Sequence, residues 1–334
     1  MLGTVINIAL FALGVLIAYD VLFEIVYRLI VRRYRYSVVN RDGFITSGLA
    51  TNLTADGRFR EKTVVVRLGW VAHWGVPNAL DIMWQFQKMF PEWSIFVPSP
   101  PGFGGTTYPV DHLGGHDVTF KSFAQASMEG VIRAGARQIA LAGASMGANI
   151  AAKEARALLE FNHRFVGLEA ICSFAGVVEK MDPEELRRRF LHPMGLIDRL
   201  AIKWWKGGVP LSTRIATRGL IRATLHETLW DIGSRRKRWP LVGLYQNMLA
   251  NTELRDDLLF LRRYGASVFA SFGDRDRLTA EGHMALRVRY SWVQILHGET
   301  HLGLCVDGRY QALVPKHSIL LTLARGCGLV PEAI

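Results

Sequence analysis

Short apolar runs alternate with longer amphipathic stretches over most of the chain beyond residue 37. Two stretches, Asn78–Phe90 and Val118–Gly135, carry apolar residues at helical spacing and predict helices. Short apolar runs, several of them bounded by glycine, predict buried strands over Lys62–Trp70, Trp93–Ser99, Gln138–Gly143, Gly167–Gly176, Ala266–Gly273 and Ser291–Gly298. This alternation is typical of an α/β domain, which we assign to residues 37–334.

Residues 177 to about 262 interrupt the strand pattern with a helical periodicity of their own. The segment contains the basic runs 187–189 and 235–238 and several tryptophans. It predicts a helical cap inserted between two strands. Its mixture of Arg, Lys and Trp suits a surface lying on anionic lipid, and equally a cap with a tryptophan core and a solvated charged face.

The first residues have a different pattern. Leu2–Tyr19 contains no charged side chain and is about as long as the roughly 17 to 25 residues that cross a bilayer. Arginines and tyrosines follow up to residue 36, as in a helix that emerges among lipid headgroups. We therefore expect residues 1–36 to form a membrane anchor, rather than a cleaved signal peptide or a buried core helix.

The distribution of charge adds an orientation. No Lys or Arg precedes the apolar stretch and four arginines closely follow it, so the positive-inside tendency predicts a domain on the cytoplasmic side. The net charge of +11 indicates an anionic binding partner. We expect this partner to be membrane lipid, and we do not expect nucleic acid. The three cysteines have no metal-ligand spacing, and no metal or cofactor is expected.

One serine stands out in the segment Gln138–Ala155. Ser145 lies between Gly143 and Gly147, after a predicted strand and before a run of helix formers. In a G-x-S-x-G turn the glycines leave room for a sharp bend that exposes a strained serine. Because a serine needs such exposure and a neighbouring base to act as a nucleophile, the pattern favours Ser145 as a nucleophile over an ordinary tight turn.

Two loops further on offer the partners of a nucleophilic serine. "GDRDRLT" follows one predicted strand and "GETHLG" follows the next, which gives the chain order Ser, Asp, His. Together with "VVVRLGW", "PSPPGFGGT" and "GASMG", these segments resemble the α/β-hydrolase superfamily of serine hydrolases from about residue 60 to 325. The resemblance implies a mostly parallel sheet flanked by helices, although Ser99 stands where many members have Asp.

The same resemblance assigns the catalytic triad. Ser145 matches the nucleophile, Asp276 the acid and His301 the base. Asp274 is an alternative acid from the same loop. For His297, at the end of its strand, a structural hydrogen bond is expected instead.

The oxyanion formed during attack on a carbonyl needs two hydrogen-bond donors. The backbone N–H of Met146, directly after the nucleophile, is expected to be one. The resemblance places the second donor in the loop after "VVVRL", where Trp70 is preferred and Trp74 is the alternative.

These observations predict a membrane-anchored serine hydrolase that cleaves an ester or thioester of a lipid-like acyl chain. Acyl transfer to an acceptor other than water would use the same acyl-enzyme. A non-catalytic binding protein on the same fold is a third interpretation.

Overall fold

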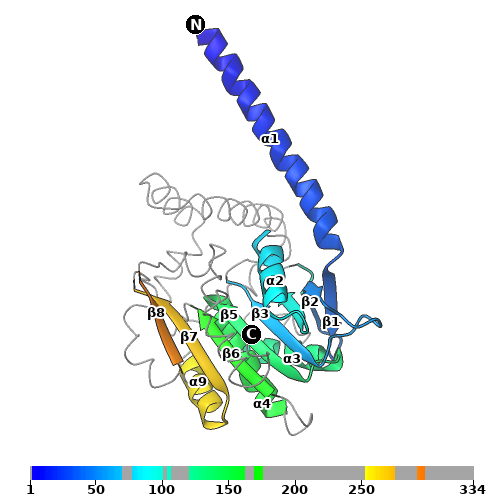
Figure 1. The fold of residues 1–334 in the computed structure, drawn as a ribbon, viewed down its shortest axis with the longest axis vertical. Helices are drawn as coiled ribbons and strands as arrows, with labels where there is room; N and C mark the ends of the chain where they lie inside the picture. Colours follow the sequence, from blue (N-terminus) through cyan, green and yellow to red (C-terminus); the bar gives the residue numbers. More distant parts are fainter. Residues whose placement is uncertain are drawn as a thin grey trace, which may run out of the picture.

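The computed structural model describes residues 2–69, 77–100, 104–106, 120–161, 169–175, 253–274 and 292–297. These residues build one sheet with helices on both faces and one long helix that projects from it (Figure 1). Its strands are β1 (Arg35–Val39), β2 (Ile45–Thr51), β3 (Lys62–Arg67), β4 (Ser94–Pro98), β5 (Gln138–Ala144), β6 (Glu169–Ala175), β7 (Ser267–Gly273) and β8 (Trp292–Leu296). Its helices are α1 (Leu2–Arg32), α2 (Pro77–Met89), α3 (Phe120–Arg133), α4 (Met146–Phe161) and α9 (Glu253–Arg263).

The sheet has the strand order β1-β2-β4-β3-β5-β6-β7-β8. Strand β2 is antiparallel to β1 and β4, and the remaining pairs are parallel. Central strands such as β3 and β5 read as apolar runs because helices cover both of their faces. Their carboxyl ends meet at one edge of the sheet, where the loops after β3, β5, β7 and β8 begin.

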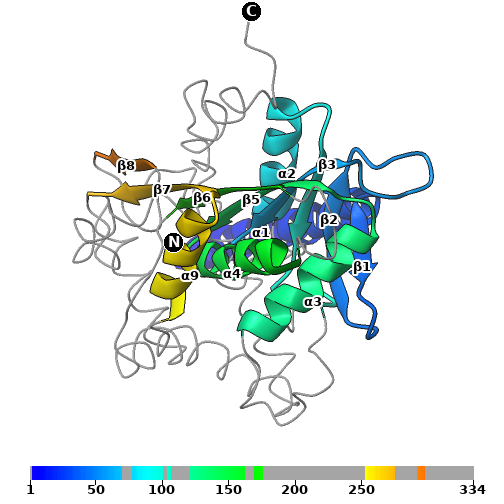
Figure 2. The same ribbon diagram turned by 90° about the horizontal axis from the view of Figure 1, so that it is seen from below.

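Alternate residues of each central strand enter two separate cores. Val65 and Leu141 face one core with α3, α4 and α9, whereas Val64 and Val66 face the other with α2 and the end of α1. Figure 2 shows α2 on one side of the sheet and α3, α4 and α9 on the other. The two-residue period of the strands therefore fixes which helices lie on which face.

Helix α1 has two parts with different surroundings. Near its end, Tyr27 and Val31 are buried in the core that contains α2. Earlier along the helix, large apolar side chains such as Phe11, at 74% exposure, are open to the surroundings. Among the described residues, no helix is both long enough and apolar enough to cross a membrane, in contrast to the span predicted over Leu2–Tyr19.

The predicted strands and helices named above occur with shifted ends. The hairpin β1–β2 was not predicted, and β1 begins at Arg35, inside the segment 1–36 assigned to the anchor. Helix α9 lies at the end of the segment assigned to the cap, yet its residues Leu254, Leu258 and Leu261 pack in the same core as α4. The rest of that segment, 177–252, lies outside the described residues.

Candidate active site

Ser145 occupies the turn between β5 and α4, at the carboxyl edge of the sheet. Its φ angle is 52°, in the left-handed region that costs a residue with a Cβ about 1–2 kcal/mol. The side chain is half-buried, and the Ser145 carbonyl accepts the backbone N–H of Ala148 at 2.9 Å. A strained serine at the start of a helix is the geometry that the G-x-S-x-G pattern predicts.

Both flanking glycines are required by close backbone contacts. A Cβ on Gly143 would lie 2.5 Å from the Gly147 carbonyl oxygen, and a Cβ on Gly147 would lie 2.2 Å from the Arg67 carbonyl oxygen. Neither space admits a methyl group. The turn can therefore approach the end of β3 only with glycine at these two positions.

The loop after β3 passes directly beside the serine. An added Cβ on Gly69 would lie 3.5 Å from the Ser145 Cβ. Met146, the next residue after the serine, is the first residue of α4, so its N–H has no acceptor within the helix. The described geometry thus brings both the helix start at Met146 and the loop after β3 close to Ser145, and an oxyanion site needs donors from such neighbouring segments.

Asp274 and His297 lie at the ends of β7 and β8 and contact each other. The Nδ1 atom of His297 is 3.1 Å from Oδ2 of Asp274, and the His297 side chain is 91% exposed. This is the structural hydrogen bond expected for His297. Strands β5 and β8 are three positions apart in the sheet, or about 14 Å, too far for His297 to reach Ser145 from the strand end.

The other predicted site residues lie outside the described residues. They are Asp276 and His301, predicted as acid and base, and Trp70 and Trp74, predicted as alternatives for the second oxyanion donor. In the sequence, Asp276 follows β7, His301 follows β8, and both tryptophans follow β3. The structure therefore describes Ser145 and Met146, the residues predicted as the nucleophile and as one oxyanion donor.

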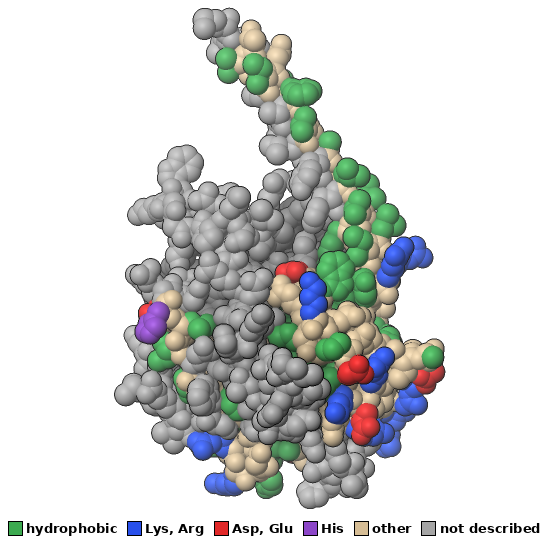
Figure 3. All heavy atoms as spheres, viewed as in Figure 1, with side chains coloured by type: hydrophobic (Ala, Val, Ile, Leu, Met, Phe, Trp, Pro, Cys, Tyr) green, Lys and Arg blue, Asp and Glu red, His purple; other side chains and the backbone are tan. Residues whose placement is uncertain are grey.

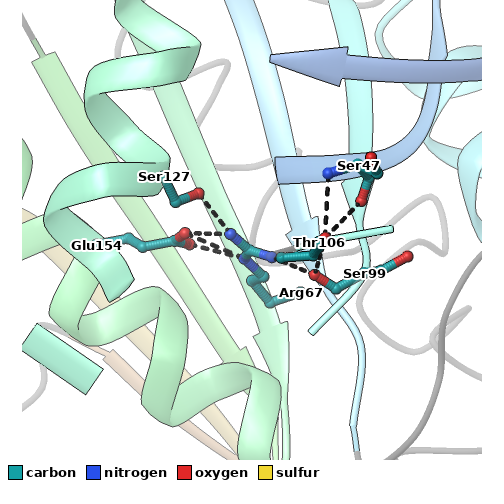
Figure 4. A network of polar contacts seen from close by, with 6 residues as sticks. All are labelled: Ser47, Arg67, Ser99, Thr106, Ser127 and Glu154. Atoms are coloured by element: carbon teal, nitrogen blue, oxygen red, sulfur yellow. Dashed lines mark hydrogen bonds and ion pairs between the residues drawn. The ribbon is translucent and has the colours of Figure 1, made fainter. Parts of the chain in front are cut away.

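A buried ion pair beneath the site was not predicted. Arg67, the last residue of β3, and Glu154 of α4 are 1% and 0% exposed, and Nε of Arg67 lies 3.0 Å from Oε2 of Glu154. The guanidinium also donates to the Ser99 carbonyl oxygen at 3.2 Å and to Ser127 Oγ at 2.7 Å (Figure 4). An arginine ending a valine-rich strand is the signal in the sequence that could have revealed it.

No known family profile and no curated protein sequence matches the chain. Solved structures do. A membrane phospholipase A, described as a bacterial virulence factor, superposes with a TM-score of 0.58 at 18% identity over 98% of this chain and 97% of its own. A 2-hydroxy-6-oxo-6-phenylhexa-2,4-dienoate hydrolase from Rhodococcus sp. strain RHA1 superposes with a TM-score of 0.54 at 16% identity, over 88% of this chain and 99% of its own.

The similar structures also include a different type of enzyme. The bottromycin epimerase BotH superposes with a TM-score of 0.51 at 15% identity, over 87% of this chain and 99% of its own. Identities this low show a shared fold and leave the reaction to be argued from the site.

Proposed function

Because the chain has the α/β-hydrolase fold, we propose that it is a serine hydrolase that cleaves a carboxylic ester or thioester. The observation that carries the proposal is the conformation of Ser145: a positive φ angle between two glycines that no other residue can replace. A protein that only binds a ligand has no need to keep a serine under this strain. The fold alone would not suffice, since an epimerase shares it.

In the proposed reaction, His301 removes the proton of Ser145 as Ser145 Oγ attacks the carbonyl carbon of the substrate. Asp276 orients the imidazole and stabilises its cation. The oxyanion accepts the N–H of Met146 and a second donor from the loop after Gly69, for which Trp70 is preferred over Trp74. His301 then protonates the leaving group, and water releases the acyl group by the same steps in reverse order. Transfer to another acceptor would replace only this water.

The assignment of acid and base is tested by matched pairs of substitutions. We expect Asp276→Asn and His301→Ala to lower kcat for p-nitrophenyl butyrate by about 10⁴-fold or more. Asp274→Asn and His297→Ala, in the neighbouring exposed pair, should stay within about threefold of the parent. The opposite pattern in steady-state kinetics would move the acid and base to the residues at the strand ends.

The proposed substrate is a lipid-like acyl ester, and the support for it is helix α1. This helix has 31 residues and is about 46 Å long, with apolar side chains exposed along it. Figure 3 shows these side chains along the helix and Lys or Arg side chains near the end that meets the domain. Exposed apolar residues followed by arginines suit contact with an anionic bilayer. We therefore propose that α1 holds the enzyme at a membrane, with the domain on the cytoplasmic side.

Flotation with vesicles tests this attachment. We expect the chain to float with phosphatidylglycerol-containing vesicles, and Phe11→Asp combined with Val15→Asp to lower the bound fraction at least about tenfold, because a carboxylate is costly in hydrocarbon. Leu259→Asp, on an exposed site of α9, is the matched control and should float as the parent does. Equal flotation of all three proteins would show that α1 does not carry the attachment.

A further inference from the structure

The Arg67–Glu154 ion pair joins two segments that meet at the nucleophile. Arg67 pairs with Gly143 in the sheet and directly precedes Leu68 and Gly69, where the loop beside Ser145 begins. Glu154 belongs to α4, the helix that Ser145 starts. One guanidinium thus connects the strand before the oxyanion loop with the helix after the nucleophile.

The remaining contacts of the guanidinium extend this connection. The Ser99 carbonyl oxygen, just after β4, accepts from Nη1 of Arg67. The same oxygen accepts from the hydroxyl of Thr106 at 3.2 Å, so it connects the two ends of the glycine-rich segment between them. Ser127, which accepts from Nη2, belongs to α3. The Phe123 ring of α3 lies under the guanidinium, 5.0 Å from its central carbon. Arg67 therefore ties four elements together at one point (Figure 4).

Stability alone does not explain a buried ion pair at this place. Well-packed apolar residues often serve equally well in such a position, because desolvation of both charges cancels much of their attraction. Arg67 has the property that apolar residues lack: its planar fork of donors holds Glu154, Ser127 and the Ser99 carbonyl in fixed directions. The Arg67 and Leu68 carbonyl oxygens would lie 2.2 and 2.4 Å from a Cβ on Gly147, so a shift of β3 would move the turn of Ser145 directly.

We propose that Arg67 is a positioning residue, which together with Glu154 sets the distance between the oxyanion loop after β3 and the Ser145–Met146 turn. This inference rests on the proposed serine hydrolase function. An oxyanion donor acts through distances of about 2.7–3.1 Å, and a displacement of about 1 Å can cost about 100-fold in rate. Arg67 itself does not touch the substrate.

The chain offers a matched control on the same helix. Lys153 of α4 and Asp257 of α9 form a second buried ion pair, with Nζ 2.6 Å from Oδ2 and exposures of 6% and 0%. Asp257 also pairs with Arg156, which keeps Glu160 as a partner. This pair joins α4 to α9, whereas the Arg67–Glu154 pair joins α4 to β3. Its loss should affect stability without changing the geometry at Ser145.

The experiment measures the rate constant of fluorophosphonate labelling, kcat and KM for p-nitrophenyl butyrate, and thermal unfolding. Arg67→Met with Glu154→Leu removes both charges and leaves no unpaired one. We expect this double variant to react about 100-fold more slowly with the probe and to lose kcat equally, with KM little changed. Lys153→Met with Asp257→Leu should react at the parent rate, even if its unfolding temperature falls further.

Arg67→Lys provides a second route to the answer. Lysine keeps the charge for Glu154 but cannot reach all three partners at once, so an intermediate rate constant is expected. Labelling is measured at a temperature where thermal unfolding shows each variant to be folded, so that a lower rate constant reports misplacement rather than instability. If Arg67→Lys and the folded double variant both react at the parent rate, the positioning role is wrong and the hydrolase proposal is unaffected. A parent protein that the probe does not label would remove the hydrolase proposal itself.

Discussion

Replacing Ser145 with alanine is expected to lower the hydrolysis of p-nitrophenyl butyrate by about 10⁶-fold, to the rate left by binding alone. Such a loss follows because the serine oxygen forms the bond to the acyl group, and no other group in the proposed site can replace it. Alanine has a Cβ as serine does and is equally strained at φ 52°, so the unfolding temperature should change little. Steady-state kinetics and calorimetry on the two proteins measure both effects.

A glycine at the same position is the informative control. Ser145→Gly should be as inactive as the alanine variant, yet more stable than it by about 1–2 kcal/mol, because glycine adopts the left-handed conformation without strain. Substantial turnover by either variant would mean that another residue is the nucleophile. Equal stability of the two variants would mean that the turn carries no strain.

Gly147→Ala has the second large expected effect, this time on folding. The new methyl carbon would lie 2.2 Å from the Arg67 carbonyl oxygen and 2.4 Å from that of Leu68. Both oxygens belong to the backbone at the end of β3. The strand is held between β4 and β5, and a backbone oxygen cannot move away by rotation of a side chain. We expect a loss of about 3 kcal/mol or more in the free energy of unfolding, measured by urea denaturation, together with the loss of ester hydrolysis.

Gly69→Ala is the matched substitution for this effect. Its methyl group would lie 3.5 Å from Ser145 Cβ and 3.6 Å from the Ala144 carbonyl oxygen, which are ordinary contacts. The free energy of unfolding should stay within about 1 kcal/mol of the parent value. If Gly147→Ala were as stable as Gly69→Ala, the close approach of α4 to β3 would be wrong.

Local patterns were enough to predict most of the described sheet. Strand β3 follows from its apolar run, helix α2 from apolar spacing and helix α4 from a run of helix formers, and the turn at Ser145 follows from two glycines at fixed positions. These features depend on residues close together in the sequence. The hairpin β1–β2 was missed because β1 is short, alternates poorly between buried and exposed positions, and begins within the cluster of arginines around the end of α1.

The ion pair beneath the site shows what local patterns miss. Arg67 ends an apolar strand and Glu154 lies in the middle of α4, and neither residue by itself shows that it has a buried partner. The role of each residue depends on the other, 87 residues away in the sequence. Only the packing of α4 against β3 shows that the two form an ion pair. Similarly, the contact between Asp274 and His297 follows from the pairing of β7 with β8, rather than from the order of residues in the loops.

Mass spectrometry after fluorophosphonate treatment tests the nucleophile most directly. Trypsin should release the peptide Gln138–Lys153, in which Ser145 carries the only hydroxyl group. A serine hydrolase with its nucleophile at this turn should carry one phosphonyl adduct on that peptide, and the adduct should be absent from Ser145→Ala. An adduct on another peptide, or none in folded protein that keeps its esterase activity, would contradict Ser145 as the nucleophile.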